Sequence, residues 1–266
     1  MLKIFTFAHK RPDFIGLQVR SFKQYLQEPF EFVVFNNATF DQDCGLYDEI
    51  NRQCDQWDAR SIAIQKEPDV VNWCQAQEST GPLFNASGCY ANPNVACAYP
   101  LCWAWARHIS KETSPICFLD SDIFLIQPVC ISERLQTFDL CYIPQFRVGA
   151  AEYMWNAFFS ADLSRLPNPS TLNWWCGRVN DVPVDVGGQT CHYLKDHLEL
   201  KVLRIHSAFI PDDPKTNFHP TNYEHIYFDD KLFGLHYRSG SNWNHQPAIY
   251  HEKKTRWLLE QLNLKG

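Results

Sequence analysis

The chain has 266 residues, of which 45% are hydrophobic and 20% are charged, and its formal net charge is −6. This balance predicts a folded protein with a sizeable core, and the lack of any Lys/Arg stripe argues against nucleic acid as a partner. No apolar run reaches the roughly 18 residues of a membrane-spanning helix, and the N-terminus lacks the pattern of a signal peptide. We therefore expect a cytoplasmic protein, with peripheral attachment to a membrane face as the alternative. The oligomeric state stays open.

The first 35 residues predict a strand, a helix and a second strand. An apolar run over residues 2–7 is followed by Pro12 and Asp13, which suit the first turn of a helix. The next apolar residues recur at helical spacing, namely Ile15, Val19, Phe22 and Leu26. Residues 30–35 then form a second apolar run. This order is typical of a βαβ unit, and hence of a parallel sheet.

Ligands of such sheets bind beyond the carboxyl ends of the strands. Ala8, His9 and Arg11 follow the first strand, and Asn36 follows the second. We expect these four residues to contact a nucleotide. An ordinary polar turn is the simpler interpretation for the asparagine.

The stretch from Cys44 to Pro93 has a weak pattern, which predicts a long functional loop with one short strand over residues 61–64. We expect contacts in this stretch and around residues 146–151 to decide the donor. A helix is predicted over residues 95–108, and a strand over residues 116–119.

Two aspartates follow that last strand inside the apolar sequence FLDSDIFL. In an extended stretch, residues i and i+2 point the same way, so Asp120 and Asp122 would address one ligand together. Two carboxylates this close repel each other, and a divalent cation would compensate for the repulsion. The pair therefore predicts a metal site that holds the phosphates of a nucleotide.

FLDSDIFL resembles the DxD motif of GT-A glycosyltransferases, and two later segments are similar to further motifs of that superfamily. One is residues 153–159, YMWNAFF, and the other is residues 235–243, LHYRSGSNW. The resemblance implies a single α/β domain over residues 1–266, with a mainly parallel central sheet and helices on both faces. It places a nucleotide-binding half at about residues 1–125 and an acceptor half at about residues 126–266.

The resemblance also implies roles for individual residues. Asp120, Asp122 and His236 would bind Mn²⁺ or Mg²⁺, with Asp120 and Ser121 also contacting the donor, a nucleoside diphosphate sugar. Residues of the last motif would contact its diphosphate, namely Arg238, Ser239 and Asn242. Without the resemblance, His236 would be read as a structural histidine.

The resemblance also implies a functional acid at a helix start in the acceptor half. Asp185 is therefore the candidate catalytic base, because it precedes a Gly-Gly pair where a helix is expected to begin near Gly188. It would take a proton from the acceptor hydroxyl if the enzyme inverts the anomeric centre, and would only position a substrate if the enzyme retains it. Asp181 is the second candidate, and a helix N-cap is the structural interpretation of Asp185.

Trp174, Trp175 and Trp243 are predicted to stack on an acceptor sugar, with core packing as the alternative. Residues 250–262 predict an amphipathic helix with a solvated basic face that includes Lys254.

The function expected from this sequence is metal-dependent transfer of a hexose or pentose from a UDP- or GDP-sugar to a glycan or another hydroxyl acceptor. The alternatives are a sugar nucleotidyltransferase and a non-catalytic carbohydrate-binding protein. The segment after the first strand, FAHKR, lacks the glycine-rich loop typical of nucleotidyltransferases.

Overall fold

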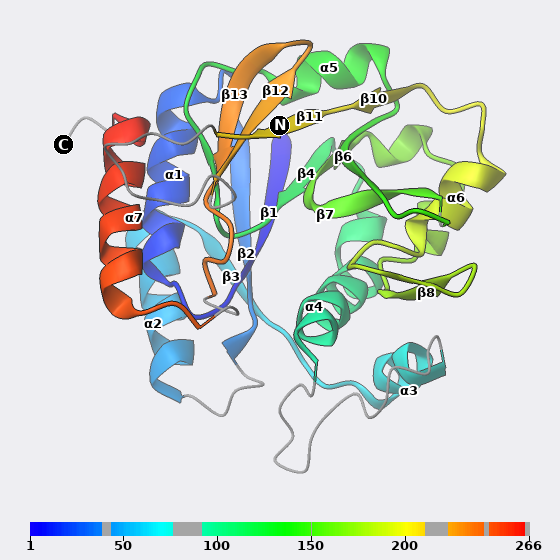
Figure 1. Ribbon diagram of the computed structural model, residues 1–266, viewed down its shortest axis with the longest axis horizontal. Helices are drawn as coiled ribbons and strands as arrows, with labels where there is room; N and C mark the ends of the chain where they lie inside the picture. The colour runs from blue at the N-terminus through cyan, green and yellow to red at the C-terminus, as the bar shows by residue number, and fades with distance from the viewer. Residues whose placement is uncertain (39–43, 77–91, 150, 211–222, 242–244, 264–266) are drawn as a thin grey trace.

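The protein has an α/β fold built on a seven-stranded, mainly parallel sheet (Figure 1). The computed structural model describes residues 1–38, 44–76, 92–149, 151–210, 223–241 and 245–263. The strands lie in the spatial order β10 (Val202–Arg204), β6 (Leu140–Phe146), β7 (Glu152–Ala161), β4 (Ile116–Leu119), β1 (Leu2–Ala8), β2 (Phe30–Asn36) and β3 (Arg60–Ala63). Only β7 runs antiparallel to its neighbours. The α/β class with a mainly parallel central sheet is therefore confirmed.

Helices cover both faces of this sheet, as expected (Figure 1). The α-helices are α1 (Asp13–Tyr25), α2 (Cys44–Trp57), α3 (Pro68–Ala76), α4 (Pro93–Arg107), α5 (Ile131–Thr137), α6 (Thr190–Asp196) and α7 (Ala248–Leu262). Short 3-10 turns are η2 (Ile109–Lys111), η3 (Leu163–Arg165) and η4 (Pro169–Thr171). No helix in the described part of the chain combines the length and apolar character that crossing a bilayer requires.

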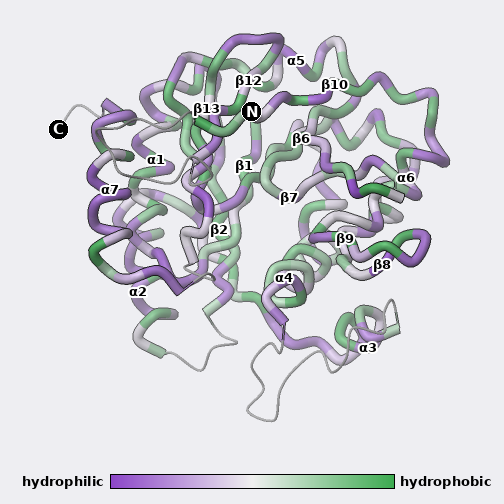
Figure 2. Tube along the Cα trace, viewed as in Figure 1, coloured by the Kyte–Doolittle hydropathy of each residue, from purple (hydrophilic) through white to green (hydrophobic). Residues whose placement is uncertain are grey.

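Each central strand is buried on both faces, because its successive side chains enter two different clusters. Ile4 and Val34 pack on the side of α1, α2 and α5, whereas Phe5 and Phe35 pack on the side of α3, α4 and α6. Figure 2 shows the result as hydrophobic residues along the central strands and α4, while much of α7 is hydrophilic. The near-continuous apolar runs of β1 and β2 follow from this double burial.

A second, antiparallel sheet adjoins the first. Its order is β11 (His206–Phe209), β12 (Glu224–Phe228), β13 (Lys231–His236) and β5 (Ile123–Leu125). A separate hairpin consists of β8 (Gly177–Val179) and β9 (Val182–Val184). Because β5 follows β4 in the chain after three residues, the junction between the two sheets lies at the acidic motif.

The predicted βαβ unit is confirmed. β1 and β2 pair in parallel, with Ala8 opposite Asn36 at their carboxyl ends. Three of the four predicted apolar residues of α1 are buried, namely Ile15, Val19 and Phe22. Leu26 caps the end of the helix with a backbone hydrogen bond to Phe22 O.

The predicted long loop between Cys44 and Pro93 is wrong for its described part, which contains α2 and α3 as well as the expected β3. One face of α2 carries apolar residues at helical spacing and packs in the same hydrophobic cluster as α1. These residues are Leu46, Ile50, Cys54 and Trp57. Charged and amide residues lie between these apolar residues and obscure the helical period in the sequence. Counting cysteine as an apolar residue would have revealed the period. Residues 77–91 of the stretch lie outside the described part.

The stacking role predicted for Trp174 and Trp175 is wrong. Their side chains are 0% and 1% exposed, so neither ring has a face available to a sugar. Trp174 instead lies 4.7 Å from the ring of Phe118 and 5.1 Å from that of Phe159, centroid to centroid. Trp243 lies outside the described residues.

Trp174→Ala is expected to lower the free energy of unfolding by about 3–5 kcal/mol, because it empties a large site in the aromatic core. Urea denaturation followed by circular dichroism measures the change. Phe146→Ala is the matched control, since Phe146 is 67% exposed and its loss should cost less than about 1 kcal/mol. Equal effects of the two substitutions would contradict the core assignment.

Candidate metal and donor site

The acidic motif forms a turn at the junction of the two sheets. β4 ends at Leu119 and β5 begins at Ile123, and the N–H of Ile123 donates to the carbonyl of Asp120 at 3.1 Å. The extended backbone expected for Asp120–Asp122 is therefore wrong. The two carboxylates nevertheless converge, because the turn folds them back toward one point.

Neighbouring elements fix this turn through buried hydrogen bonds. The Gln18 amide on α1 donates to the carbonyls of Asp120 and Ile123, each at 3.0 Å, and Gln18 is fully buried. From the other side, Asp120 N–H donates to the carbonyl of Ala157 on β7 at 3.0 Å. Buried backbone groups need such partners, so the turn has little freedom to rearrange.

Strand register brings a histidine to the turn. In the second sheet, β13 pairs with β5 so that His236 lies opposite Ile123, the residue after Asp122. On its other side β13 pairs with β12, and there His236 lies opposite Glu224. This row across the sheet therefore places the imidazole beside Glu224 and next to the turn that carries Asp122.

The resulting geometry fits a divalent cation. His236 Nε2 lies 3.2 Å from Asp122 Oδ1, and His236 Nδ1 lies 3.0 Å from Glu224 Oε2. One potential ligand atom each from Asp120, Asp122 and His236 lies within 4.8 Å of the others. A metal-binding histidine characteristically donates its second ring N–H to a carboxylate, which is the place that Glu224 occupies.

The charges of these groups are strongly coupled. Burial, then the neighbouring Asp122 carboxylate, raises the pKa of Asp120 to about 7. Burial opposes the charge of His236, but the carboxylates of Asp122 and Glu224 outweigh it and raise the pKa of His236 to about 9. Burial also opposes the charge of Asp122, whereas His236 and the Gly240 N–H lower its pKa overall. The His236 imidazole accordingly bridges the carboxylates of Asp122 and Glu224.

The loop after β13 closes against Asp122. Tyr237 N–H donates to the Asp122 carbonyl at 2.8 Å, and Gly240 N–H donates to Asp122 Oδ2 at 2.9 Å. A Cβ atom on Gly240 would lie 2.9 Å from the Cβ of Asp122, so only glycine permits this approach. Arg238 and Ser239 adopt left-handed backbone conformations, with φ of 58° and 57°.

A buried lysine supports this loop from behind. Lys254 on α7 is 0% exposed, and its ammonium donates to the carbonyl of Arg238 at 2.9 Å. It also lies 3.9 Å from the centroid of the Tyr237 ring, a cation–π contact. Burial lowers the pKa of Lys254 to about 7, although Asp122 opposes the shift. The solvated position predicted for Lys254 is therefore wrong.

Two further residues contact or influence the cluster. Asn156 on β7 donates from its amide to Asp120 Oδ1 at 2.9 Å. It lies in the YMWNAFF segment, so the sequence offered a signal for it. No sequence signal pointed to Glu224, because only strand pairing places it beside His236. Asp185 lies outside the converging group, but its charge contributes to raising the pKa of Asp120.

The segment around Asp185 is positioned by close packing on β7. Gly187 has a φ of 86°, and a Cβ atom there would lie 2.1 Å from the carbonyl oxygen of Met154. α6 begins at Thr190, close to the predicted start near Gly188, and its N-cap is Gln189. Asp185 Oδ1 instead accepts from the N–H of Val186 at 2.8 Å. The N-cap interpretation of Asp185 is therefore wrong.

The residues predicted to contact the nucleotide divide into two groups. Asn36 is fully buried, and its amide binds Tyr47 O, Asn51 Oδ1 and Ala38 N–H, so its predicted contact with a nucleotide is wrong. Ala8 is 1% exposed, and its carbonyl accepts from Asn37 N–H.

The remaining predicted donor contacts are at least partly exposed. His9 and Ser121 follow β1 and β4, two adjacent parallel strands. Ser239 is half-buried in the loop after β13. The guanidinium of Arg238 lies 3.7 Å from Glu224 Oε1, and that of Arg11 binds Asp13 at 2.6 Å. Asn242 lies outside the described residues.

The sequence matches no protein-family model, and it is similar to no curated protein. The structure superposes on the crystal structure of the galactosyltransferase LgtC in complex with donor and acceptor sugar analogues. The TM-score is 0.42 and the identity is 11%, over 77% of this chain and 73% of that one. The chemistry of the site follows from its own residues.

Manganese binding is expected to strengthen at least about tenfold between about pH 6 and about pH 8, because metal ligands must be deprotonated. Asp120 and His236, with pKa values of about 7 and about 9, would then lose their protons to the solvent. Calorimetric titration in buffers of different ionisation enthalpy measures both the affinity and the protons released. Binding that is independent of pH, or unchanged by Asp122→Asn, would contradict the assigned ligands.

Proposed function

We propose that this protein is a metal-dependent glycosyltransferase that uses a nucleoside diphosphate sugar as its donor. A UDP-sugar or a GDP-sugar is the expected donor. The observation that carries the proposal is the convergence of Asp120, Asp122 and His236 at the carboxyl ends of parallel strands. This edge is where α/β sheets bind nucleotides. The residues fit Mn²⁺ or Mg²⁺, since two carboxylates and one imidazole, backed by Glu224, suit either ion.

The bound ion would neutralise the diphosphate that leaves as the glycosidic bond breaks. The chain's own contribution is to orient that diphosphate and to limit the access of water. The N–H of Gly240 holds Asp122 in place, and the ammonium of Lys254 fixes the carbonyl of Arg238 behind it. Ser121 and Ser239 offer hydroxyl groups to the donor, and His9 an imidazole. These supports are rigid, which favours a preorganised site.

In this proposal residues 1–125 bind the nucleotide, and residues 126–266 bind the acceptor and close the site. Asp185 then acts at the acceptor hydroxyl. The charge of Asp185 contributes to raising the pKa of Asp120, but Asp185 is not one of the three proposed metal ligands. In an inverting reaction its carboxylate accepts the hydroxyl proton, and in a retaining reaction it only positions a substrate.

Calorimetric titration with UDP, GDP, ADP and CMP, with and without manganese, tests the donor class. One nucleoside diphosphate is expected to bind only with manganese, and Asp122→Asn should weaken it by at least about 100-fold, because it loses a metal ligand and a charge. Asp55→Asn, at an exposed position of α2, is the matched control and should bind as the wild type does. Metal-independent binding, or none to any nucleotide, would favour the carbohydrate-binding alternative.

Asp185→Asn is expected to leave nucleotide binding intact while slowing hydrolysis of the matching sugar nucleotide by about 100-fold or more, as loss of a general base does. Hydrolysis uses water as the acceptor, so the assay needs no knowledge of the natural acceptor. Asp181→Asn, four residues earlier, is the matched variant and should retain hydrolysis. The reverse pattern would assign the base to Asp181, and equal rates in both would remove Asp185 from the chemistry.

A further inference from the structure

A break in strand pairing lies next to the acidic turn. β7 pairs with β4 as far as Phe158, which lies opposite Leu119, the last residue of β4. The register between β7 and β6 shifts at the same level, because four residues of β7 (155–158) lie across from one residue of β6, Ile143. β7 therefore bulges where the acidic turn begins. Such bulges are common beside active sites, where they change the direction of individual side chains.

The bulge brings two consecutive side chains to the proposed metal ligands. Asn156 donates from its amide to Asp120 Oδ1 at 2.9 Å. The ring of Trp155 lies 5.3 Å from that of His236, centroid to centroid, with an angle of 60° between their planes. In a regular strand, neighbouring side chains point to opposite faces of the sheet. Here both contact the site, from a strand that contributes none of the proposed ligands.

Trp155 differs from the tryptophans of the core. The indole nitrogens of Trp174 and Trp175 are buried and have no hydrogen-bond partner in the described structure. Trp155 is only half-buried, since part of its ring packs in the hydrophobic cluster of α1 and the rest is exposed. Its N–H has no partner among the described residues either, but it is not one of the buried nitrogens. Solvent therefore reaches this donor, and so can a ligand.

The order of the strands places Trp155 away from the nucleotide. β4 lies between β7 and β1, and β2 lies beyond β1. A nucleotide is expected at the carboxyl ends of β1 and β2, because α/β sheets bind such ligands there. Trp155 lies on the other side of the acidic motif. Since the sugar of the donor is attached at the far end of the diphosphate from the nucleoside, this is the side from which an acceptor would approach.

We propose that Trp155 binds the acceptor and that this acceptor is a carbohydrate. A sugar presents both C–H groups and hydroxyl groups, and an indole offers a matching apolar ring and one N–H donor. The N–H donates to a hydroxyl oxygen of the sugar, while the exposed part of the ring covers its C–H groups. Packing in the cluster and against His236 holds the ring in place, which lowers the entropy lost on binding.

The inference depends on the proposed function in one respect. A bound sugar is an acceptor only if the metal site holds a nucleotide sugar, whereas the contact between Trp155 and a sugar does not require one. Trp155→Phe isolates this contact, because it removes the N–H but keeps an aromatic ring beside His236.

NMR of the indole N–H groups tests the contact directly. The chain has nine tryptophans, and the signal of Trp155 is the one that disappears in Trp155→Phe. The probes are the methyl glycosides of glucose, galactose, mannose and N-acetylglucosamine, added with and without manganese and the nucleoside diphosphate that calorimetry identifies. At least one glycoside is expected to shift the Trp155 signal. Trp155→Phe should weaken its binding about 3- to 10-fold, the effect of one hydrogen bond.

Trp73→Phe is the matched control. Trp73 is 41% exposed on α3, which covers the opposite face of the sheet from the cluster of Trp155. This variant should bind the glycoside as the wild type does. Circular dichroism checks that both variants are folded, and calorimetry with manganese checks that Trp155→Phe keeps the metal site. A Trp155 signal that no glycoside moves, or equal affinity in wild type and Trp155→Phe, would overturn the proposal.

Two further outcomes separate the possible errors. A shift caused by the sugar nucleotide but by no glycoside would assign Trp155 to the donor sugar and overturn its role at the acceptor. If no nucleotide binds but a glycoside binds with the expected dependence on Trp155, the sugar contact stands and the glycosyltransferase proposal falls. If a nucleotide binds with manganese and no glycoside moves the Trp155 signal, the metal site stands and the acceptor assignment falls.

Discussion

The structure depends on a cluster of ionisable groups buried where its two sheets meet. Asp120, Asp122 and Glu224 surround His236 in a place that excludes most solvent. Burying charges is costly unless they are paired and hydrogen-bonded. The raised pKa of Asp120 reflects that cost, whereas the raised pKa of His236 reflects its pairing with the carboxylates of Asp122 and Glu224. A divalent cation at the point where Asp120, Asp122 and His236 converge would compensate for the buried carboxylates, which is the physical reason for the proposed metal site.

The second sheet positions two members of this cluster, His236 and Glu224. β5 continues directly from the acidic turn, so pairing with β13 fixes where His236 lies, and pairing with β12 fixes Glu224. A register shift of one residue would point both side chains to the opposite face. Gln18 and Asn156 then hold the turn and the Asp120 carboxylate from α1 and β7. Five elements, β5, β12, β13, α1 and β7, therefore determine the position of the three proposed ligands.

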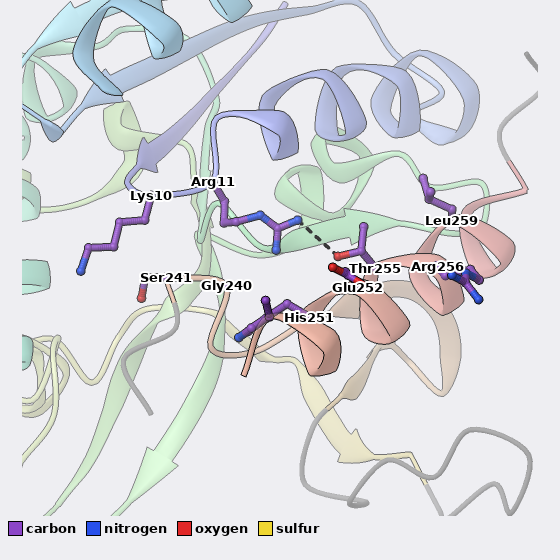
Figure 3. A pocket seen from close by; sticks show the side chains of 10 residues that line it. Lys10, Arg11, Gly240, Ser241, His251, Glu252, Thr255, Arg256 and Leu259 are labelled. Atoms are coloured by element: carbon purple, nitrogen blue, oxygen red, sulfur yellow. Dashed lines mark hydrogen bonds between the residues drawn. The ribbon is translucent and has the colours of Figure 1, made fainter. Parts of the chain in front are cut away.

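α7 supports the loop that contacts the proposed metal site. Its buried face carries Lys254 to the carbonyl of Arg238, and its adjacent face lines a pocket together with Gly240 and Ser241 (Figure 3). Tyr237 lies between these parts, because its ring contacts the Lys254 ammonium and its hydroxyl contacts His251. The loop of residues 237–241, which contacts Asp122 through Gly240, is therefore supported from behind by α7.

The sequence by itself determined the elements whose chemistry is local. The apolar runs of β1, β2 and β4 are buried on both faces, so they could be recognised without knowing their neighbours. The pair Asp120 and Asp122 was recognisable for the same reason, since its apolar flanks indicated a buried position. His236 was a candidate ligand only through the resemblance of residues 235–243, the segment that contains it.

Only the tertiary structure decided which side chains meet. Trp174 and Asn36 carry groups that suit ligands, yet packing commits them to the core and to internal hydrogen bonds. Glu224 and Lys254 carry no local signal, and they join the site because β12 pairs with β13 and α7 packs behind the loop. Burial and strand register are properties of contacts between segments distant in the chain. Periodicity along the sequence reports which face is apolar, but it does not report what that face will touch.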